Sequence, residues 1–219
     1  MARYLVLTGY DDKMQEVGDR CAATHKAYAD RHGYDQEVVR KYVPGIHPSY
    51  QKVAFIAERI ADYDAILWLD ADSVVMNKWF MIDKFIGSGH VMDISVDWCA
   101  WPHEDDDSEN ITTLSVSCGN FIIWNTPDLP RFLDTWYRYG ERYASRDICC
   151  WEQDGLRAAI GNDKWMNARV RRHPRRTFNA VHETCVNHNF PKVAPKPYQP
   201  GDFILHLTNV DRIAILDSL

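Results

Sequence analysis

The most constraining feature of the sequence is an uninterrupted apolar run over residues 65–69 that ends directly in two acidic residues, Asp70 and Asp72. A run without polar residues is typical of a central strand in a parallel sheet, because both faces of such a strand are buried. A carboxylate costs several kcal/mol to bury without a partner. The two carboxylates at the end of this strand therefore need a compensating charge.

Strand and helix patterns alternate in the first third of the chain. An apolar run at 4–8 precedes a helical pattern at 13–31 that ends before Gly33, and a strand pattern at 36–39 precedes a helix for which Ser49 is the candidate N-cap. This order predicts an α/β fold with a mostly parallel central sheet, helices on both faces and a small antiparallel portion. A length of 219 residues corresponds to one domain.

Charge and composition exclude several classes of protein. The net charge of -6 disfavours nucleic acid as the main partner, because nucleic-acid affinity depends on neutralising phosphates. No apolar run approaches the roughly 18 residues that span a bilayer, and the chain begins without a signal-peptide pattern, so we expect a cytoplasmic protein. The six cysteines form no CxxC pair, so we expect free thiols rather than structural zinc.

The spacing of Asp70 and Asp72 predicts a shared binding point. Side chains two residues apart in an extended segment point the same way, and open α/β folds bind ligands at the carboxyl ends of their strands. A hard divalent cation, bound through oxygen and shared with substrate phosphates, would supply the compensating charge. The alternative is a strand-to-loop junction in which one carboxylate caps a helix and the other is solvated.

His206 lies in an otherwise apolar strand pattern at residues 203–207. Such a histidine is either a core residue or, where it meets Asp70 and Asp72, a third metal ligand. A nitrogen ligand beside carboxylates favours Mn²⁺ over Mg²⁺.

Three polar residues, Glu152, Gln153 and Asp154, open a helical pattern that ends at Gly161. They are either the first turn of a helix, where acidic groups interact well with the helix dipole, or part of an active site. Periodicity alone leaves both interpretations open.

Several sequence blocks occur in a fixed order along the chain. They are His47-Pro48-Ser49-Tyr50-Gln51-Lys52, residues 63–72, residues 117–126, Glu152-Gln153-Asp154, Phe178-Asn179 and His206. The ordered set resembles the GT-A glycosyltransferases, and most of all the GMA12/MNN10 family of galactosyl-, mannosyl- and xylosyltransferases.

This resemblance implies a single GT-A domain over residues 1–219, with a nucleotide-binding half at about 1–100 and an acceptor-binding half at about 101–219. It implies an enzyme that transfers a hexose or pentose from a nucleotide-diphospho-sugar, a UDP-sugar first, to a hydroxyl of a glycan or other acceptor. Retention of the anomeric configuration is implied as well. The implied cofactor is Mn²⁺ or Mg²⁺, held by Asp70, Asp72 and His206.

The resemblance also assigns roles to single residues. Gln153 matches the residue near the anomeric carbon, and since an amide is a poor nucleophile, this favours front-face attack with the leaving phosphate as the base. Glu152 or Asp154 would serve a double displacement instead. The residues expected to contact the nucleotide-sugar are Thr8, Gly9, Tyr10, Lys52, Asp70, Ala71, Gly119 and Arg212.

Two aromatic residues and one amide are candidates for the acceptor side. Trp98 and Trp101 could stack on an acceptor sugar, or pack at the rim of the core, and Asn179 belongs to the same group. Arginines at 169, 171 and 172 could add charge for the phosphates, or could face water on an edge strand.

Two other functions compete with glycosyl transfer. A haloacid-dehalogenase-like phosphohydrolase also places DxD after an apolar strand, but there the motif opens the domain and precedes Gly-Thr, whereas Ser73-Val74 follows it here. A catalytically inactive module that binds a sugar nucleotide or a glycan could use the same fold, because fold does not determine function.

Overall fold

The computed structural model describes residues 2–87, 89–97, 115–144, 151–185 and 197–219. Within these residues a central sheet has the strand order β2-β1-β3-β6-β5-β7. Its strands are β1 (Tyr4–Gly9), β2 (Asp35–Val39), β3 (Ala65–Leu69), β5 (Met92–Val96), β6 (Val116–Trp124) and β7 (Val170–His173).

Strand β3, the predicted apolar strand, lies between β1 and β6, and all of its residues are buried. It runs parallel to β1 and antiparallel to β6, while β2 and β7 run parallel to their neighbours β1 and β5. The prediction of an α/β fold with a mostly parallel sheet is therefore confirmed.

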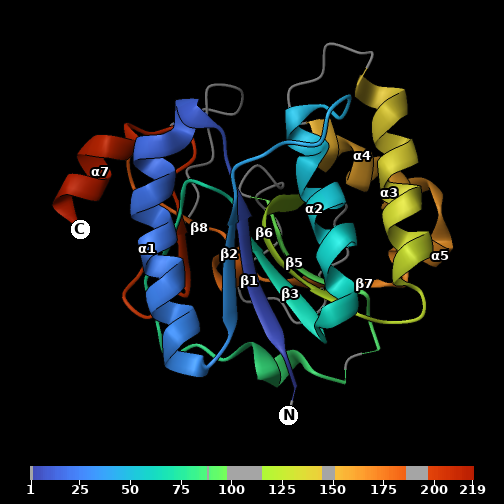
Figure 1. The fold of residues 1–219 in the computed structure, drawn as a ribbon, viewed down its shortest axis with the longest axis horizontal. Coiled ribbons are helices and arrows are strands. Elements are labelled where there is room, and N and C mark those ends of the chain that lie inside the picture. The colour runs from blue at the N-terminus through green and yellow to red at the C-terminus, as the bar shows by residue number, and fades with distance from the viewer. Residues whose placement is uncertain (1, 88, 98–114, 145–150, 186–196) are drawn as a thin grey trace.

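Helices cover both faces of this sheet (Figure 1). Successive residues of β1 face opposite sides: Leu5 and Leu7 pack towards the helices α2 to α5, whereas Tyr4 and Val6 pack towards α1. The helices are α1 (Gln15–His32), α2 (Gln51–Arg59), α3 (Leu129–Ala144), α4 (Trp151–Asn162) and α5 (Lys164–Asn167).

A second, smaller sheet has the order β4-β9-β8. Its strands are β4 (Ser73–Val75), β9 (Ile204–His206) and β8 (Ala180–Val181). β9 pairs antiparallel with β4, in a register that places His206 opposite Ser73. This pairing carries a residue from near the C-terminus to the segment that directly follows Asp72.

The remaining helices are α6 (Arg175–Phe178) and α7 (Arg212–Ser218). Helix α7 lies at the outer side of α1 in Figure 1, where Arg20 and Asp217 form an ion pair of 2.8 Å. Among the described residues, no helix combines the length and apolar character needed to cross a bilayer.

The two predicted helix signals in the first third have different outcomes. Gly33 follows α1 with a left-handed φ of 69°, as a C-terminal glycine should. Ser49 is not the N-cap: a 3₁₀ turn, Pro48–Tyr50, precedes α2, and the His47 ring accepts from the backbone N–H of Ser49. The Ser49 hydroxyl lies 2.7 Å from the same ring nitrogen instead.

The strand directions bring several strand ends to one edge of the central sheet. Because β5 and β3 are both antiparallel to β6, they are parallel to each other, and their carboxyl ends lie on the same edge as that of β1. The residues at these ends include Gly9, Asp70 and Asp97. This is the edge at which open α/β folds bind ligands.

Candidate metal centre and active site

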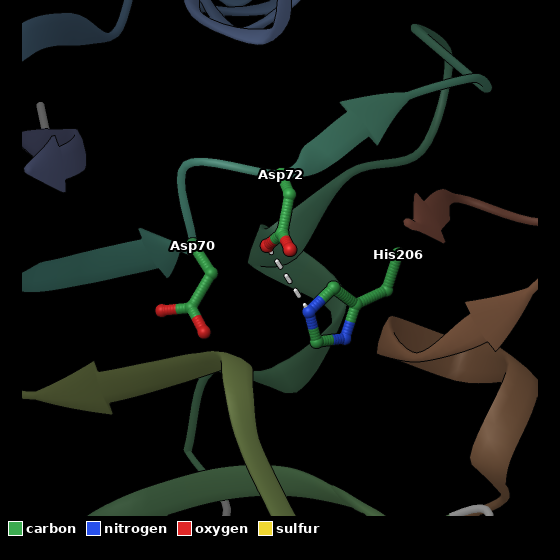
Figure 2. A group of neighbouring side chains, drawn as sticks. All are labelled: Asp70, Asp72 and His206. Atoms are coloured by element: carbon green, nitrogen blue, oxygen red, sulfur yellow. Dashed lines mark ion pairs between the residues drawn. The ribbon is translucent and has the colours of Figure 1, made fainter. Parts of the chain in front are cut away.

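Asp70, Asp72 and His206 come together at this edge, as Figure 2 shows. Each offers one ligand atom, and these atoms all lie within 4.8 Å of one another. The two carboxylates come from the turn between β3 and β4, and the imidazole comes from the end of β9. The structure brings these three residues together, as the sequence predicted.

Asp72 lies between the side chains of Arg212 and His206. Nε of Arg212 donates to its Oδ2 over 2.8 Å, and Nε2 of His206 lies 3.3 Å from its Oδ1. Burial alone would raise the pKa of Asp72, but His206 and Arg212 outweigh burial and hold that pKa well below its usual range. The carboxylate is therefore ionised wherever the protein is folded near neutral pH.

The tautomer of His206 is determined by Asn179, whose Oδ1 lies 2.8 Å from Nδ1. A carbonyl oxygen only accepts, so Nδ1 carries a proton and Nε2 presents its lone pair to the Asp72 carboxylate. Two acceptors that face each other need a proton or a cation between them. Burial would lower the pKa of His206, but Asp72 outweighs it and raises that pKa. A buried oxygen that orients the imidazole is typical support for a metal-binding histidine, so the donor set fits a divalent cation.

Gly119 lies against the imidazole ring. A Cβ built at this position would come 2.5 Å from Cε1 of His206, closer than real side chains approach. The missing side chain at 119 therefore makes room for the ring of His206. The expectation that Gly119 also contacts the donor sugar stays a prediction.

Lys52 is buried and joins three parts of the site. Its Nζ lies 2.9 Å from Asp70 Oδ1, 2.8 Å from Glu152 Oε1 and 2.8 Å from the Cys118 carbonyl oxygen. Burial would lower the pKa of Lys52, but Asp70 and Glu152 outweigh it and raise that pKa. These acceptors use all three N–H groups of the ammonium ion.

Asp70 is oriented through one of its two oxygens. Oδ1 accepts from Lys52 and also from Trp68 Nε1 over 2.7 Å. Oδ2 has no hydrogen-bond donor within the part of the chain that the structure describes. Since a carboxylate oxygen with free lone pairs is what a hard cation needs, Oδ2 is the available ligand atom.

The three polar residues that open α4 have separate surroundings. Glu152 pairs with Lys52, and burial raises the pKa of its carboxyl in spite of that partner. Gln153 accepts from the Cys118 N–H over 2.8 Å and donates to Asp97 Oδ2 over 3.1 Å. Asp154 accepts from Arg157 over 3.2 Å.

A cavity of about 230 Å³ is lined by two of the three candidate ligands, Asp70 and Asp72. Gly9 at the end of β1 and Tyr10 directly after it line the cavity together with Ala71 and Lys52. Thr8 is buried and is not among the lining residues, and its hydroxyl has no partner within the described residues. Arg212 reaches the site through Asp72.

Some predicted residues lie elsewhere. Trp98 and Trp101 fall outside the described residues. Two of the predicted arginines have partners in the chain itself: Arg169, directly before β7, pairs with Asp128 over 3.0 Å, and Arg171 in β7 contacts Asp93. Strand β7 is an edge strand, as the alternative interpretation required.

Sequence reasoning missed one site residue, Asp97. Its carboxylate is buried and contacts Gln153 and Arg157. The only sequence signal is that Asp97 directly follows a strand, and it is weaker than the one at Asp70 because β5 contains Asp93 and Ser95 whereas β3 is uninterrupted and apolar.

The fold matches that of solved glycosyltransferases. A glycosyltransferase involved in glycosylation of the major capsid of PBCV-1 superposes with a TM-score of 0.70 at 14% identity, covering 99% of this chain and 98% of that one. The galactosyltransferase LgtC, solved with donor and acceptor sugar analogues, superposes with a TM-score of 0.58 at 13% identity, covering 93% and 87%. The chain has the GT-A glycosyltransferase fold.

Residues 3–97 match the model of the galactosyl transferase GMA12/MNN10 family. The chain is also 25% identical over 186 residues to the probable alpha-1,6-mannosyltransferase MNN10 of Saccharomyces cerevisiae, covering 71% of this chain and 45% of that protein. The chain thus spans less than half the length of this relative. The predicted resemblance is confirmed, and family model, relative and fold all group the chain with glycosyltransferases.

Proposed function

We propose that this protein is a metal-dependent glycosyltransferase that moves a hexose or pentose from a UDP-sugar to a hydroxyl of a glycan or another acceptor. The observation that carries the proposal is the set of Asp70, Asp72 and His206 at the carboxyl edge of the sheet, where both aspartates line a cavity. The confirmed resemblance and the fold support the class of reaction.

Asp70, Asp72 and His206 would hold Mn²⁺ or Mg²⁺, and the imidazole favours Mn²⁺. Such a cation neutralises charge on the diphosphate leaving group when the glycosidic bond breaks. Arg212 would add a second positive charge for the phosphates, because its guanidinium already lies at the ligand Asp72. Gly9, Tyr10 and Ala71 would contact the nucleotide along the cavity wall.

The transfer breaks the bond from the anomeric carbon to the diphosphate oxygen and forms a bond to the acceptor oxygen. We propose retention by front-face attack, with the acceptor proton passing to the leaving phosphate. Two features of α4 support this: Gln153 is an amide, and the carboxylates of Glu152 and Asp154 are both engaged in ion pairs. A double displacement would require one of these carboxylates to leave its partner.

The two halves would divide the substrates. Residues 1–100 hold most of the described cavity wall, from Gly9 to Asp72, which supports a nucleotide-binding role for this half. Residues 101–219 would bind the acceptor. Asn179, which belongs to this half, contacts the ring of His206. The cytoplasmic location predicted from the sequence stays a prediction.

The test is release of the nucleoside diphosphate from candidate donors. UDP-galactose, UDP-glucose and UDP-xylose, then GDP-mannose, are incubated with the protein and Mn²⁺, and slow hydrolysis is followed with and without a chelator. We expect turnover for one UDP-sugar that stops on chelation. Changing a residue that supports a metal ligand lowers metal affinity by ~10–100-fold. Asp72→Asn changes a ligand itself, so metal affinity should fall by more than this, and the circular dichroism spectrum should not change.

Unchanged UDP affinity of Asp72→Asn in the presence of Mn²⁺ would contradict the proposed site. Mn²⁺-dependent binding of UDP without turnover of any donor would favour the inactive binding module. The phosphohydrolase alternative has lost its support, because the fold is that of the GT-A glycosyltransferases.

A further inference from the structure

Asp97 adds a further carboxylate at the edge of the central sheet where Asp70 and Asp72 lie. It directly follows β5, its side chain is only 5% exposed, and its backbone N–H is bonded to the Ser115 carbonyl oxygen over 2.9 Å. A carboxylate buried to this degree needs donors close by. Two of them are the Gln153 amide and the Arg157 guanidinium, both from α4.

The contact with Asp97 determines which way the Gln153 amide points. The NH₂ end of an amide only donates and the oxygen end only accepts. With its nitrogen on the Asp97 carboxylate, the oxygen of Gln153 accepts from the backbone N–H of Cys118. A flipped amide would place oxygen against carboxylate and NH₂ against N–H, so both contacts would become repulsive.

The oxygen of Gln153 is thereby tied to the strand that supports the candidate metal ligands. The carbonyl of Cys118 accepts from Lys52, which holds Asp70, and the carbonyl of the next residue, Gly119, accepts from the Asp70 N–H over 2.9 Å. One stretch of β6 therefore links Gln153 to the metal side of the site.

We propose that Asp97 is a positioning residue for Gln153. It orients the Gln153 side chain so that the amide oxygen, rather than the nitrogen, lies at the reaction centre. This inference rests on the proposed function and on the role near the anomeric carbon that the family resemblance assigns to Gln153. A carbonyl oxygen has two lone pairs, and Cys118 uses one of them. The second can stabilise the positive charge of an oxocarbenium-like transition state, whereas an NH₂ group in its place would oppose that charge.

The test is a double-mutant cycle on Asp97→Asn and Gln153→Met. We expect Asp97→Asn to lower kcat at least tenfold with the KM for the nucleotide-sugar within twofold, because the contact matters for the transition state rather than for donor binding. In the Gln153→Met background, the same Asp97→Asn change should alter kcat less than twofold.

Arg157→Gln is the matched control, because it removes a different donor to Asp97 and leaves Gln153 in place. We expect its kcat within threefold of the wild type. A loss of kcat in Arg157→Gln as large as that in Asp97→Asn would overturn the proposal, and so would fully additive losses in the cycle.

A readout without turnover separates this proposal from the proposed function. The side-chain NH₂ signals of Gln153, identified in ¹H–¹⁵N spectra by their loss in Gln153→Met, should be sharp and protected from exchange in the wild type. They should shift and broaden in Asp97→Asn and persist in Arg157→Gln. If no nucleotide-sugar is turned over, the proposed function fails, while unchanged signals in Asp97→Asn overturn the positioning role by themselves.

Discussion

Two buried carboxylates, Asp93 and Asp72, illustrate two uses of the same costly group. Asp93 lies on β5 with no exposed surface, and its oxygens meet Trp124 Nε1 and His173 Nε2, each over 2.6 Å, and the Arg171 guanidinium. These partners sit on the adjacent strands β6 and β7, so every contact belongs to the rigid sheet. Burial would raise the pKa of Asp93, but its three partners outweigh burial and lower it.

Asp72 has a different kind of surroundings. One partner, Arg212, comes from a short helix and is 36% exposed, and the other, His206, presents a nitrogen that is held as an acceptor. The neighbouring carboxylate of Asp70 leaves Oδ2 without a donor among the described residues. A carboxylate satisfied by fixed donors contributes to the fold, whereas one that faces another acceptor is prepared for a ligand.

The largest expected effect is on the stability of the fold, and it distinguishes Asp93 from Asp72. Asp93→Asn removes the charge that Arg171 faces and should lower the free energy of unfolding by about 3–5 kcal/mol, as breaking a buried ion pair does. Mn²⁺ affinity, measured by calorimetry below the melting temperature, should not change. Asp128→Asn is the control: it breaks the more exposed Arg169 pair of 3.0 Å and should cost about 1 kcal/mol or less. Equal losses in the two variants would remove the contrast.

A second effect concerns acid stability. His25 on α1 is fully buried, its Nε2 lies 2.7 Å from the Ser73 carbonyl oxygen, and burial lowers its pKa to about 4. Between pH 6.5 and 4 the unfolded chain binds a proton that the folded chain does not, so stability falls as pH falls, by up to about 3 kcal/mol. His25→Gln, which keeps a donor for Ser73, should flatten melting temperature against pH in this window. A retained slope would assign the acid loss to other groups, and His32→Gln, at a half-buried histidine of the same helix, serves as the control.

The third effect tests the metal side through Gly119. Gly119→Ala adds a methyl group only 2.5 Å from Cε1 of His206, so the ring must move. We expect Mn²⁺ affinity to fall about 10–100-fold, which is the range for disturbing the support of a ligand. Calorimetric titration measures it, and the control is Gly33→Ala, where an added Cβ meets nothing within 4 Å and only the left-handed φ is strained. Full metal affinity in Gly119→Ala would place His206 outside the metal site.

The smallest expected effect is a rise in metal affinity together with a fall in nucleotide affinity. Arg212→Gln frees Oδ2 of Asp72 from a competing cation, so Mn²⁺ without nucleotide should bind a few-fold more tightly, in line with about 1 kcal/mol for a partly exposed pair. UDP affinity with Mn²⁺ present should fall, because a charge facing the phosphates is lost. Arg20→Gln, which removes the ion pair between the same helix and α1 without touching Asp72, should change neither affinity. Weaker Mn²⁺ binding in Arg212→Gln would show that Arg212 supports the metal ligand instead of competing with it.

Local sequence patterns were sufficient for much of the fold. The apolar run at 65–69 became the buried strand β3, and Gly33 ended α1, because a both-face-buried strand and a left-handed cap each need particular residues at particular positions. Ser49 failed as an N-cap because it lies inside the 3₁₀ turn Pro48–Tyr50, which His47 caps by accepting from the Ser49 N–H, and periodicity contains no information on such a turn.

The site was predicted in part, and the division has a physical cause. Asp70 and Asp72 are two residues apart, in the turn between β3 and β4 rather than in the extended segment that the sequence predicted, so local structure keeps them close. His206, in contrast, reaches them only because β9 pairs with β4. Asp97 and Lys52 show the same dependence on long-range contacts. Their residue types were visible in the sequence, but which oxygen or amide each one faces depends on packing between β5, β6, α2 and α4. The sequence by itself determined which chemical groups stand at the ends of the strands, and tertiary structure decided which of them meet, because hydrogen bonds and ion pairs act only over a few ångströms.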